Sequence, residues 1–332
     1  MRAVVVEGAG GPEVARVREV ARPTADLGEV VVEVVACGMC GHDQADRAGL
    51  TDVEFPVILG HEVAGTVRSV GPSVRHLRVG DRVAAKQFQH CGRCAECFRG
   101  RDMVCRRRRF TYGGYAEQVA LPESSLLQVP DGLSLERAAV VACTVGTCLQ
   151  ALTDVAALQR GETVLVTGAG GGLGMHGVQV AKALGAEVIA ATGSAVTADL
   201  KAADHVVQTT GDWWSEVMDI TNGRGVQVVL DNVGHPAVFR QAFRSAARRG
   251  RYVFTGQVSG DPVRLHPAFL FENEVTLSGS VSTSMANFAD ALDLAARDEV
   301  EPVTTSYPLD SVVEAFTALD ERRVSGRIVL IP

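Results

Sequence analysis

Apolar and polar positions alternate differently in the two halves of the chain. In the first half, short β-branched runs such as residues 29–35 are separated by turns that contain glycine or proline, up to about residue 130. Short strands with such turns are typical of an antiparallel, barrel-like sheet. In the second half, apolar strand-like runs alternate with helical patterns, as in a doubly wound parallel sheet. The sequence therefore predicts an α/β protein with two domains.

A strand, a glycine-rich turn and a helix follow one another from residue 163. Residues 163–167 form an apolar run, and a helical pattern with Val178, Ala181 and Leu184 on one face continues to Gly185. Glycines let the backbone approach a pyrophosphate, and the helix N-terminus carries partial positive charge. We therefore expect dinucleotide binding at the turn, which consists of Gly168, Gly170, Gly171, Gly172, Leu173 and Gly174.

The choice between NAD and NADP depends on the end of the next strand, expected over residues 187–191. An acidic residue about 20 positions after the turn would hold the ribose 2′-hydroxyl of NAD. Thr192, Gly193 and Ser194 occupy this region, and no acid comes before Asp199. The hydroxyls favour NADP over NAD, although no lysine or arginine lies between Thr192 and Lys201.

Further strands are expected over residues 226–230, 251–256 and 275–281. In a doubly wound sheet, ligands bind at the carboxyl ends of the strands. We therefore expect the nicotinamide crevice to be lined by Asn232, Val233, Thr255 and Gly256.

Four of the eight cysteines fall in one short window with the spacing C-x2-C-x2-C-x7-C. Structural zinc prefers a closed tetrahedron of four ligands, and Gly92 and Gly100 supply backbone freedom at the bends. Unrelated thiols, two disulfides or an iron–sulfur cluster are the alternatives. The spacing predicts a structural zinc held by Cys91, Cys94, Cys97 and Cys105.

The overall charge and hydropathy exclude some functions. The net charge of −7 argues against a general nucleic-acid binder. We find no secretory leader and no apolar stretch of about 18 residues, so we expect a protein of the reducing cytoplasm that does not span a membrane. The four arginines of residues 106–109 contrast with the negative net charge of the chain. A solvated loop is the simpler interpretation of this run, and a contact with phosphate or coenzyme A is the alternative.

Two further segments combine metal-ligand residue types: residues 37–43 contain two cysteines, a histidine and an aspartate, and residues 56–62 contain a histidine and a glutamate. With these segments, the four-cysteine window, Gly-Asp-Arg-Val at 80–83 and Gly-Gly-Tyr-Ala-Glu at 113–117, the chain resembles the zinc-binding medium-chain dehydrogenase/reductase family, the zinc alcohol dehydrogenases. The resemblance covers essentially the whole length. It implies a GroES-like catalytic domain over residues 1–144 with the zinc lobe at 91–105, a Rossmann domain over 145–284, and a return segment over 285–332.

The resemblance also implies a catalytic zinc held by Cys40, His61 and Cys143. Two thiolates and one imidazole leave the fourth position open for water or an alcohol. Glu62 would take that position transiently. Asp43 would fix the tautomer of His61 from outside the ligand set.

The chain departs from the family at the proton relay. Family members commonly carry serine or threonine two residues after the first ligand, where this chain has His42, and Ala45 stands where a relay histidine is often found. Because imidazole titrates near neutrality, we expect His42 to take over the relay. Replacing it with alanine should lower turnover and flatten its pH dependence.

By this resemblance, the protein is expected to transfer a hydride between NAD(P)(H) and an alcohol, aldehyde or ketone, with two zinc ions per subunit. The alternative is an NADPH-dependent enoyl reductase of the acryloyl-CoA or quinone type, in which metal is dispensable. Residues 143–147 and the NADP-like strand end suggest this alternative. A non-catalytic nucleotide-binding or structural protein is the third interpretation. The strand near residues 275–283 often pairs across a dimer in the family, so a homodimer or homotetramer is implied.

Overall fold

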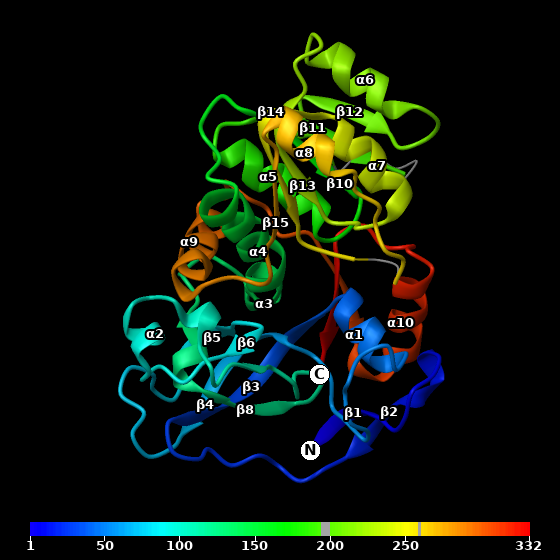
Figure 1. Cartoon of the computed structure of the whole chain (residues 1–332). Coiled ribbons are helices and arrows are strands. Elements are labelled where there is room, and N and C mark those ends of the chain that lie inside the picture. The colour runs from blue at the N-terminus through cyan, green and yellow to red at the C-terminus, as the bar shows by residue number, and fades with distance from the viewer. Residues whose placement is uncertain (194–199, 258–259) are drawn as a thin grey trace. The chain divides into compact units, whose positions relative to one another are not determined.

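The computed structural model describes residues 1–193, 200–257 and 260–332 of the chain. These residues divide into two compact units. Unit 1 comprises Met1–Gly146, Ser282–Asp298 and Pro302–Pro332, and unit 2 comprises Thr147–Val281 and Glu299–Glu301. The first and the last strand, blue and red in Figure 1, both belong to unit 1.

Unit 1 is built on a seven-stranded, mainly antiparallel sheet. Its strands run in the order β16-β17-β3-β4-β5-β9, and β8 pairs with β3. They are β3 (Glu29–Met39), β4 (Glu62–Val70), β5 (Arg82–Ala85), β8 (Gln118–Pro122), β9 (Leu126–Gln128), β16 (Thr304–Pro308) and β17 (Arg327–Ile331). Two small antiparallel pairs complete the unit: β1 (Arg2–Val6) with β2 (Ala15–Glu19), and β6 (Phe88–Gln89) with β7 (Arg109–Phe110).

Short helices and turns connect these strands. They are η1 (Pro12–Val14), α1 (Gly41–Arg47), α2 (Ala95–Phe98), η2 (Asp102–Val104), η3 (Glu123–Ser125), α3 (Leu135–Val141), α9 (Met285–Ala296), η6 (Leu309–Ser311) and α10 (Val312–Asp320). The apolar face of α10 packs into the same core as the sheet, where Phe316 meets the buried ring of Tyr115. The chain's last segment therefore completes the core of unit 1.

Strand β3 extends four residues beyond the run expected at 29–35. Buried and exposed positions alternate only over residues 32–35, whereas residues 36–39 are all buried. Gly38 pairs with Glu62 on β4, and a Cβ atom at Gly38 would lie 2.2 Å from Glu62 Oε2. Glycine is therefore required there, because the Glu62 carboxylate lies directly over the strand. The extension carries the chain to Cys40.

One long helix spans Leu135–Val155. It consists of α3, a π-helical turn η4 (Ala142–Gly146), α4 (Thr147–Gln150) and a second π-helical turn η5 (Ala151–Val155). With 21 residues and a mean hydropathy of 1.5 in its most apolar window, it is long and apolar enough to cross a membrane, contrary to our expectation. Three threonines, one glutamine and three charged residues interrupt its apolar positions, so the sequence shows no unbroken apolar run of about 18 residues there. Because 72% of that window is buried within the protein, it is a core helix.

Unit 2 is a six-stranded parallel sheet in the order β12-β11-β10-β13-β14-β15. The strands are β10 (Thr163–Thr167), β11 (Glu187–Thr192), β12 (His205–Gln208), β13 (Val226–Asp231), β14 (Ala246–Phe254) and β15 (Thr276–Gly279). They pack against α5 (Gly174–Ala183), α6 (Trp213–Ile220), α7 (Pro236–Arg244) and α8 (Pro267–Asn273), as Figure 1 shows. Strand order reverses between β10 and β13, the switch point at which such sheets bind ligands. The predicted doubly wound sheet is therefore confirmed.

Candidate functional site

Cys40 is fixed by the start of α1, for which it is the N-cap residue. Its Sγ accepts a hydrogen bond of 3.2 Å from the His42 backbone N–H, and its own N–H donates to Asp43 Oδ2 at 2.9 Å. This is a capping box in which a thiol replaces the usual hydroxyl. The thiol is thereby held at the end of β3 in one orientation.

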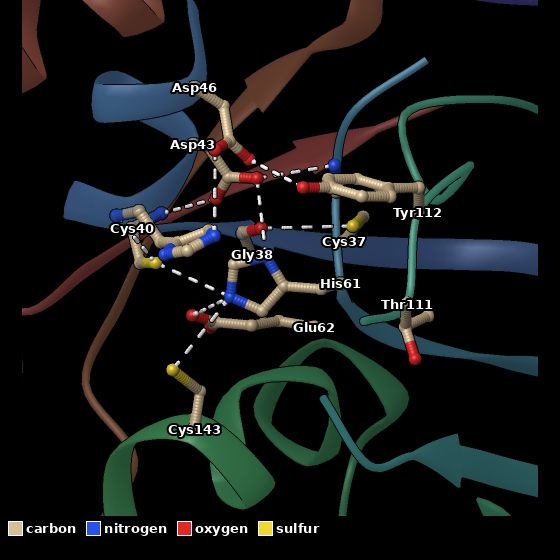
Figure 2. A network of polar contacts seen from close by, with 12 residues as sticks. Cys37, Gly38, Cys40, Asp43, Asp46, His61, Glu62, Thr111, Tyr112 and Cys143 are labelled. Carbon is tan, nitrogen blue, oxygen red and sulfur yellow. Dashed lines mark hydrogen bonds and ion pairs between the residues drawn. The ribbon is translucent and has the colours of Figure 1, made fainter. Parts of the chain in front are cut away.

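His61 lies between this thiol and two carboxylates (Figure 2). Its ring is 1% exposed, with Nε2 3.3 Å from Cys40 Sγ and Nδ1 3.2 Å from Asp43 Oδ1. Asp43 is itself held by the Gly60 N–H, which donates to Oδ1 at 3.2 Å. Asp43 therefore orients the ring so that Nε2 faces the thiols.

Cys143 completes the cluster from the π-helical turn η4, a kind of irregularity that is frequent at functional sites. Its Sγ lies 4.0 Å from His61 Nε2. One ligand atom from each of Cys40, His61, Glu62 and Cys143 can be chosen so that all lie within 4.8 Å of one another. A tetrahedral zinc with bonds of about 2.0–2.3 Å places its ligand atoms roughly 3.3–3.8 Å apart, so this donor set fits zinc.

Glu62 and Arg327 form a buried ion pair beside the thiols. Arg327 Nε lies 3.4 Å from Glu62 Oε2, and Nη2 donates to Cys143 Sγ at 3.6 Å. Burial raises the pKa of Glu62 to about 7, although Arg327 opposes this. Within the described parts of the chain, neither carboxylate oxygen of Glu62 has a hydrogen-bond partner, which is expected of a group that serves a metal. Sequence reasoning missed Arg327, because a single arginine before an apolar strand gives no signal of this contact.

The two thiols differ in their readiness to ionise. A hydrogen bond from Cys143 lowers the pKa of Cys40 well below its ordinary value. The same contact, together with burial, raises the pKa of Cys143. A divalent cation that binds both cysteines must displace any proton that they carry, because the thiolate is the metal ligand.

His42 lies next to the cluster, and its imidazole contacts Asp46. Its Nε2 is 3.5 Å from Asp46 Oδ1, and its side chain is 45% exposed. Asp46 is fully buried and accepts a hydrogen bond from Thr51 Oγ1 at 2.6 Å. It also accepts one from the Tyr112 hydroxyl at 3.2 Å (Figure 2). These groups border a cavity of about 430 Å³ lined by His42, Asp46, Thr51, Asp52, Val53, Glu54, Val57 and Tyr112.

Aromatic rings form one wall of the cluster. The ring centroid of Phe110 lies 4.7 Å from that of His61 and 4.4 Å from that of His42. Phe88 and Tyr112 contact the other sides of Phe110, at 5.0 and 5.2 Å. Sequence reasoning missed Phe110 and Asp46, since both belong to this site through contacts that no motif contains.

The four cysteines of the second cluster lie together as their spacing predicts. Neighbouring sulfurs are 3.5–3.9 Å apart, close to the edge of a zinc–thiolate tetrahedron. A disulfide needs about 2.05 Å, and all eight cysteines are free thiols. Positive φ angles of 63° and 71° at Gly92 and Gly100 make the bends. Beneath this lobe, Lys86 forms a buried ion pair with Asp102, which also accepts from the Met285 N–H at 3.3 Å.

The glycine-rich turn of unit 2 connects β10 to α5. Gly168 to Leu173 form the turn, and Gly174 is the first residue of α5. A Cβ atom at Gly174 would lie 2.1 Å from Gly168 O, so a side chain cannot be accommodated there. The bare backbone at a helix N-terminus fits the pyrophosphate of a dinucleotide.

The other residues expected at the nicotinamide cofactor also lie at the carboxyl ends of the strands. Thr255 Oγ1 donates to Asn232 Oδ1 at 2.6 Å, which joins the ends of β14 and β13. Val233 and Gly256 follow these residues in the chain, Thr192 is the buried last residue of β11, and Gly193 follows it. Ser194 lies outside the described residues.

Two families of known proteins match the chain. Residues 26–131 match the family described as alcohol dehydrogenase GroES-like domain, and residues 172–297 match the family described as zinc-binding dehydrogenase. The predicted combination of a GroES-like domain with a Rossmann-type sheet is thus confirmed.

Individual relatives cover nearly the whole chain. The chain is 30% identical over 344 residues to an acryloyl-coenzyme A reductase of Sulfurisphaera tokodaii, with 100% of both chains covered. It is 33% identical over 341 residues to an alcohol dehydrogenase of Geobacillus stearothermophilus, with 99% of each covered. Among solved structures, an NAD-dependent alcohol dehydrogenase superimposes with a TM-score of 0.94 at 34% identity over 100% of both chains. Relatives named for two different reactions are therefore similar to this chain to the same degree.

Proposed function

Because this chain belongs to the zinc-containing medium-chain alcohol dehydrogenase family, we propose that it transfers a hydride between NAD(P)(H) and a small alcohol, aldehyde or ketone. The chain is a zinc-dependent dehydrogenase or reductase with two candidate zinc sites. The observation that supports the finer proposal is the cluster of Cys40, His61 and Cys143, whose three donors leave a fourth position for the substrate oxygen. The proposed structural zinc would be held by the four cysteines of the lobe.

Residues of this chain would hold the metal ion and offset the charge around it. A zinc ion bound by Cys40, His61 and Cys143 would polarise the substrate oxygen, and a nicotinamide would accept or supply the hydride. Asp43 fixes the His61 ring, and Arg327 offsets the negative charge of the thiolates and Glu62. In alcohol oxidation, the carbon loses a hydride and the oxygen loses a proton.

We propose that this proton leaves through His42. The ring of His42 lies beside Phe110 and is 3.5 Å from the carboxylate of Asp46, while nearly half of its surface is exposed. A proton taken up by the imidazole can therefore pass to solvent at that surface. Replacing His42 with alanine should lower turnover, and replacing Ala45, on the same helix, with serine should not.

A second candidate is reduction of a conjugated carbon–carbon double bond, with hydride added to the β-carbon and a proton to the α-carbon. Two observations favour it: the usual relay hydroxyl is replaced by His42, and the acryloyl-coenzyme A reductase is similar over its full length. A turnover screen with saturated alcohols, aldehydes and enoyl thioesters separates the two reactions. Activity confined to enoyl substrates would overturn the first proposal.

For the cofactor, we propose NADPH. Thr192 and Gly193, at the end of β11, carry no carboxylate that would repel a 2′-phosphate. The expected result is a kcat/KM for NADPH at least roughly tenfold above that for NADH, about 1.4 kcal/mol in transition-state binding. A preference for NADH would overturn this choice.

We also propose a cytoplasmic homodimer or homotetramer. The eight free thiols suit a reducing compartment. Strand β15 is an edge of its sheet, and Val281 just beyond it is 56% exposed, so a second copy would cover this edge. Light scattering after gel filtration measures the subunit number, and a monomer would contradict the proposal.

A further inference from the structure

An arginine-rich segment surrounds the four-cysteine lobe of an otherwise acidic protein. Residues 91–109, which we call the arginine lobe, contain α2 (Figure 1), seven arginines and two acids, whereas the whole chain carries −7. Glu96 is shared by Arg99 and Arg101, and Asp102 is buried against Lys86. The two acids are thus engaged elsewhere and do not neutralise residues 106–109.

The four consecutive arginines are all exposed. Arg108 lies over the ring of Phe88, 4.4 Å from its centroid, and donates to Met103 O at 2.9 Å. Among the described residues, no carboxylate lies within ion-pair distance of Arg106, Arg107 or Arg109. Unpaired guanidinium groups in a row form a surface that attracts an anion, and their forked geometry matches phosphate.

This basic surface leads directly to the metal cluster. Arg109 precedes Phe110 in β7, and Phe110 contacts the rings of both His61 and His42. Phe88, beneath Arg108, contacts Phe110 on its other side. Four residue steps separate Arg106 from Phe110, so their Cα atoms are at most about 14 Å apart. A ligand with its phosphates on the arginines can therefore reach the metal ligands along an aromatic wall.

We propose that the arginine lobe binds the nucleotide phosphates of a coenzyme A thioester, whose acyl end reacts at the Cys40–His61–Cys143 cluster. This inference rests on the second candidate function, reduction of a conjugated double bond, because it places that double bond at the cluster. The pantetheine arm, which joins the thioester to the nucleotide, would lie along Phe110 and Phe88. The lobe also exposes 79% of Phe98, an aromatic face on which a base can stack.

The test compares two forms of one substrate at saturating NADPH: an enoyl-CoA thioester and the same acyl group on pantetheine, which lacks the nucleotide phosphates. In R106Q/R107Q, the KM for the CoA thioester should rise roughly tenfold or more, as expected for lost charge-assisted hydrogen bonds. The KM for the pantetheine thioester should stay within about twofold. The control R75Q/R78Q removes two exposed arginines elsewhere in unit 1 and should change neither KM. Equal changes for both substrates, or none, would overturn the proposal.

A binding measurement separates this inference from the proposed function. Free coenzyme A is titrated calorimetrically into the zinc-loaded enzyme at saturating NADPH, so that the dinucleotide site is already filled. Binding to the wild type that is lost in R106Q/R107Q supports the arginine lobe, even if no thioester is turned over. No binding, or inorganic phosphate binding as tightly as coenzyme A, would overturn it. If the wild type and R106Q/R107Q turn over the CoA thioester with the same KM, the proposed reaction stands. The arginine lobe then has no part in binding the substrate.

Discussion

Arg327 donates to Cys143 Sγ at 3.6 Å, although 184 positions separate the two residues in the chain. The same guanidinium lies 3.4 Å from Glu62 Oε2, so one buried cation contacts a thiol and a carboxylate of the cluster. Burial by itself would lower the pKa of Arg327, but Glu62 and Cys143 raise it, and the group stays charged. The last strand of the chain thus supplies the charge that balances ligands from the first half.

Arg327 should keep Glu62 from closing the fourth position of the metal. In Arg327→Gln, the carboxylate loses its cation and competes with substrate for the metal, so we expect kcat to fall about tenfold or more, roughly 1.4 kcal/mol, with zinc content unchanged. Steady-state kinetics and elemental analysis check this. Adding Glu62→Gln should restore part of the rate. An unaltered kcat in the single variant would refute this role.

The four-cysteine lobe should depend on its metal for folding. A structural zinc contributes roughly 10–16 kcal/mol of apparent binding energy, comparable to the 5–15 kcal/mol stability of a whole domain. Cys97→Ser should therefore lose one zinc per subunit and aggregate on mild heating, as should the wild type treated with a strong chelator. Cys148→Ala, a buried cysteine outside both clusters, should keep the full zinc content. A metal-free protein that stays folded would contradict the assignment.

The glycine turn should tolerate no side chain at Gly174. A Cβ atom there would meet Gly168 O at 2.1 Å, which forces the turn open, so cofactor affinity should fall at least about tenfold in Gly174→Ala. Fluorescence titration with NADPH measures this while zinc content reports on unit 1. Gly279→Ala, at the end of β15, meets nothing within 4 Å and should bind normally. Equal affinities in the two variants would argue against this turn as the cofactor site.

The ion pair of Glu162 with Arg251 should make stability depend on pH. Its hydrogen bonds, one of them at 2.9 Å, lower the pKa of Glu162 below 4.5. A depressed folded-state pKa contributes stability that is present above the unfolded value and is lost as the pH falls through the folded one. Glu162→Gln should therefore cost about 1 kcal/mol at pH 7, a modest amount because the pair is partly solvated. The difference in Tm from the wild type should shrink below about pH 4.5; a difference that is constant with pH would contradict it.

Local patterns predicted the second half of the fold closely. The strand expected at 163–167 is β10, and the helix expected after Gly174 ends just before Gly185, where φ is +83°. Strand β14 begins five residues before the expected Arg251, because the exposed Arg248 and Arg249 interrupt the apolar pattern. The periodicity of apolar residues reflects which positions are buried. A strand end that is partly exposed lacks this periodicity, so its sequence does not predict it.

Contacts between distant segments explain what the sequence could not reveal about the site. Cys40, His61 and Cys143 were expected together only through the resemblance, since spacing cannot bring a helix turn to a strand end 82 positions away. Arg327, Phe110 and Asp46 belong to no motif. The pairing of β17 with β3 brings Arg327 to the metal ligands, and the pairing of β6 with β7 positions Phe110. Asp46 lies near them because it is on α1. Tertiary contacts determine these positions, and no single segment encodes them.

The most direct test of the central claim compares the zinc content of the wild type with that of Cys143→Ala by elemental analysis. Turnover of alcohols, aldehydes and enoyl thioesters is measured on the same two proteins. We predict two zinc ions per subunit in the wild type, and one in Cys143→Ala, with activity lost and the four-cysteine lobe still loaded. A Cys143→Ala enzyme that keeps both zinc ions and full turnover would contradict the claim that Cys40, His61 and Cys143 hold the metal that the reaction needs.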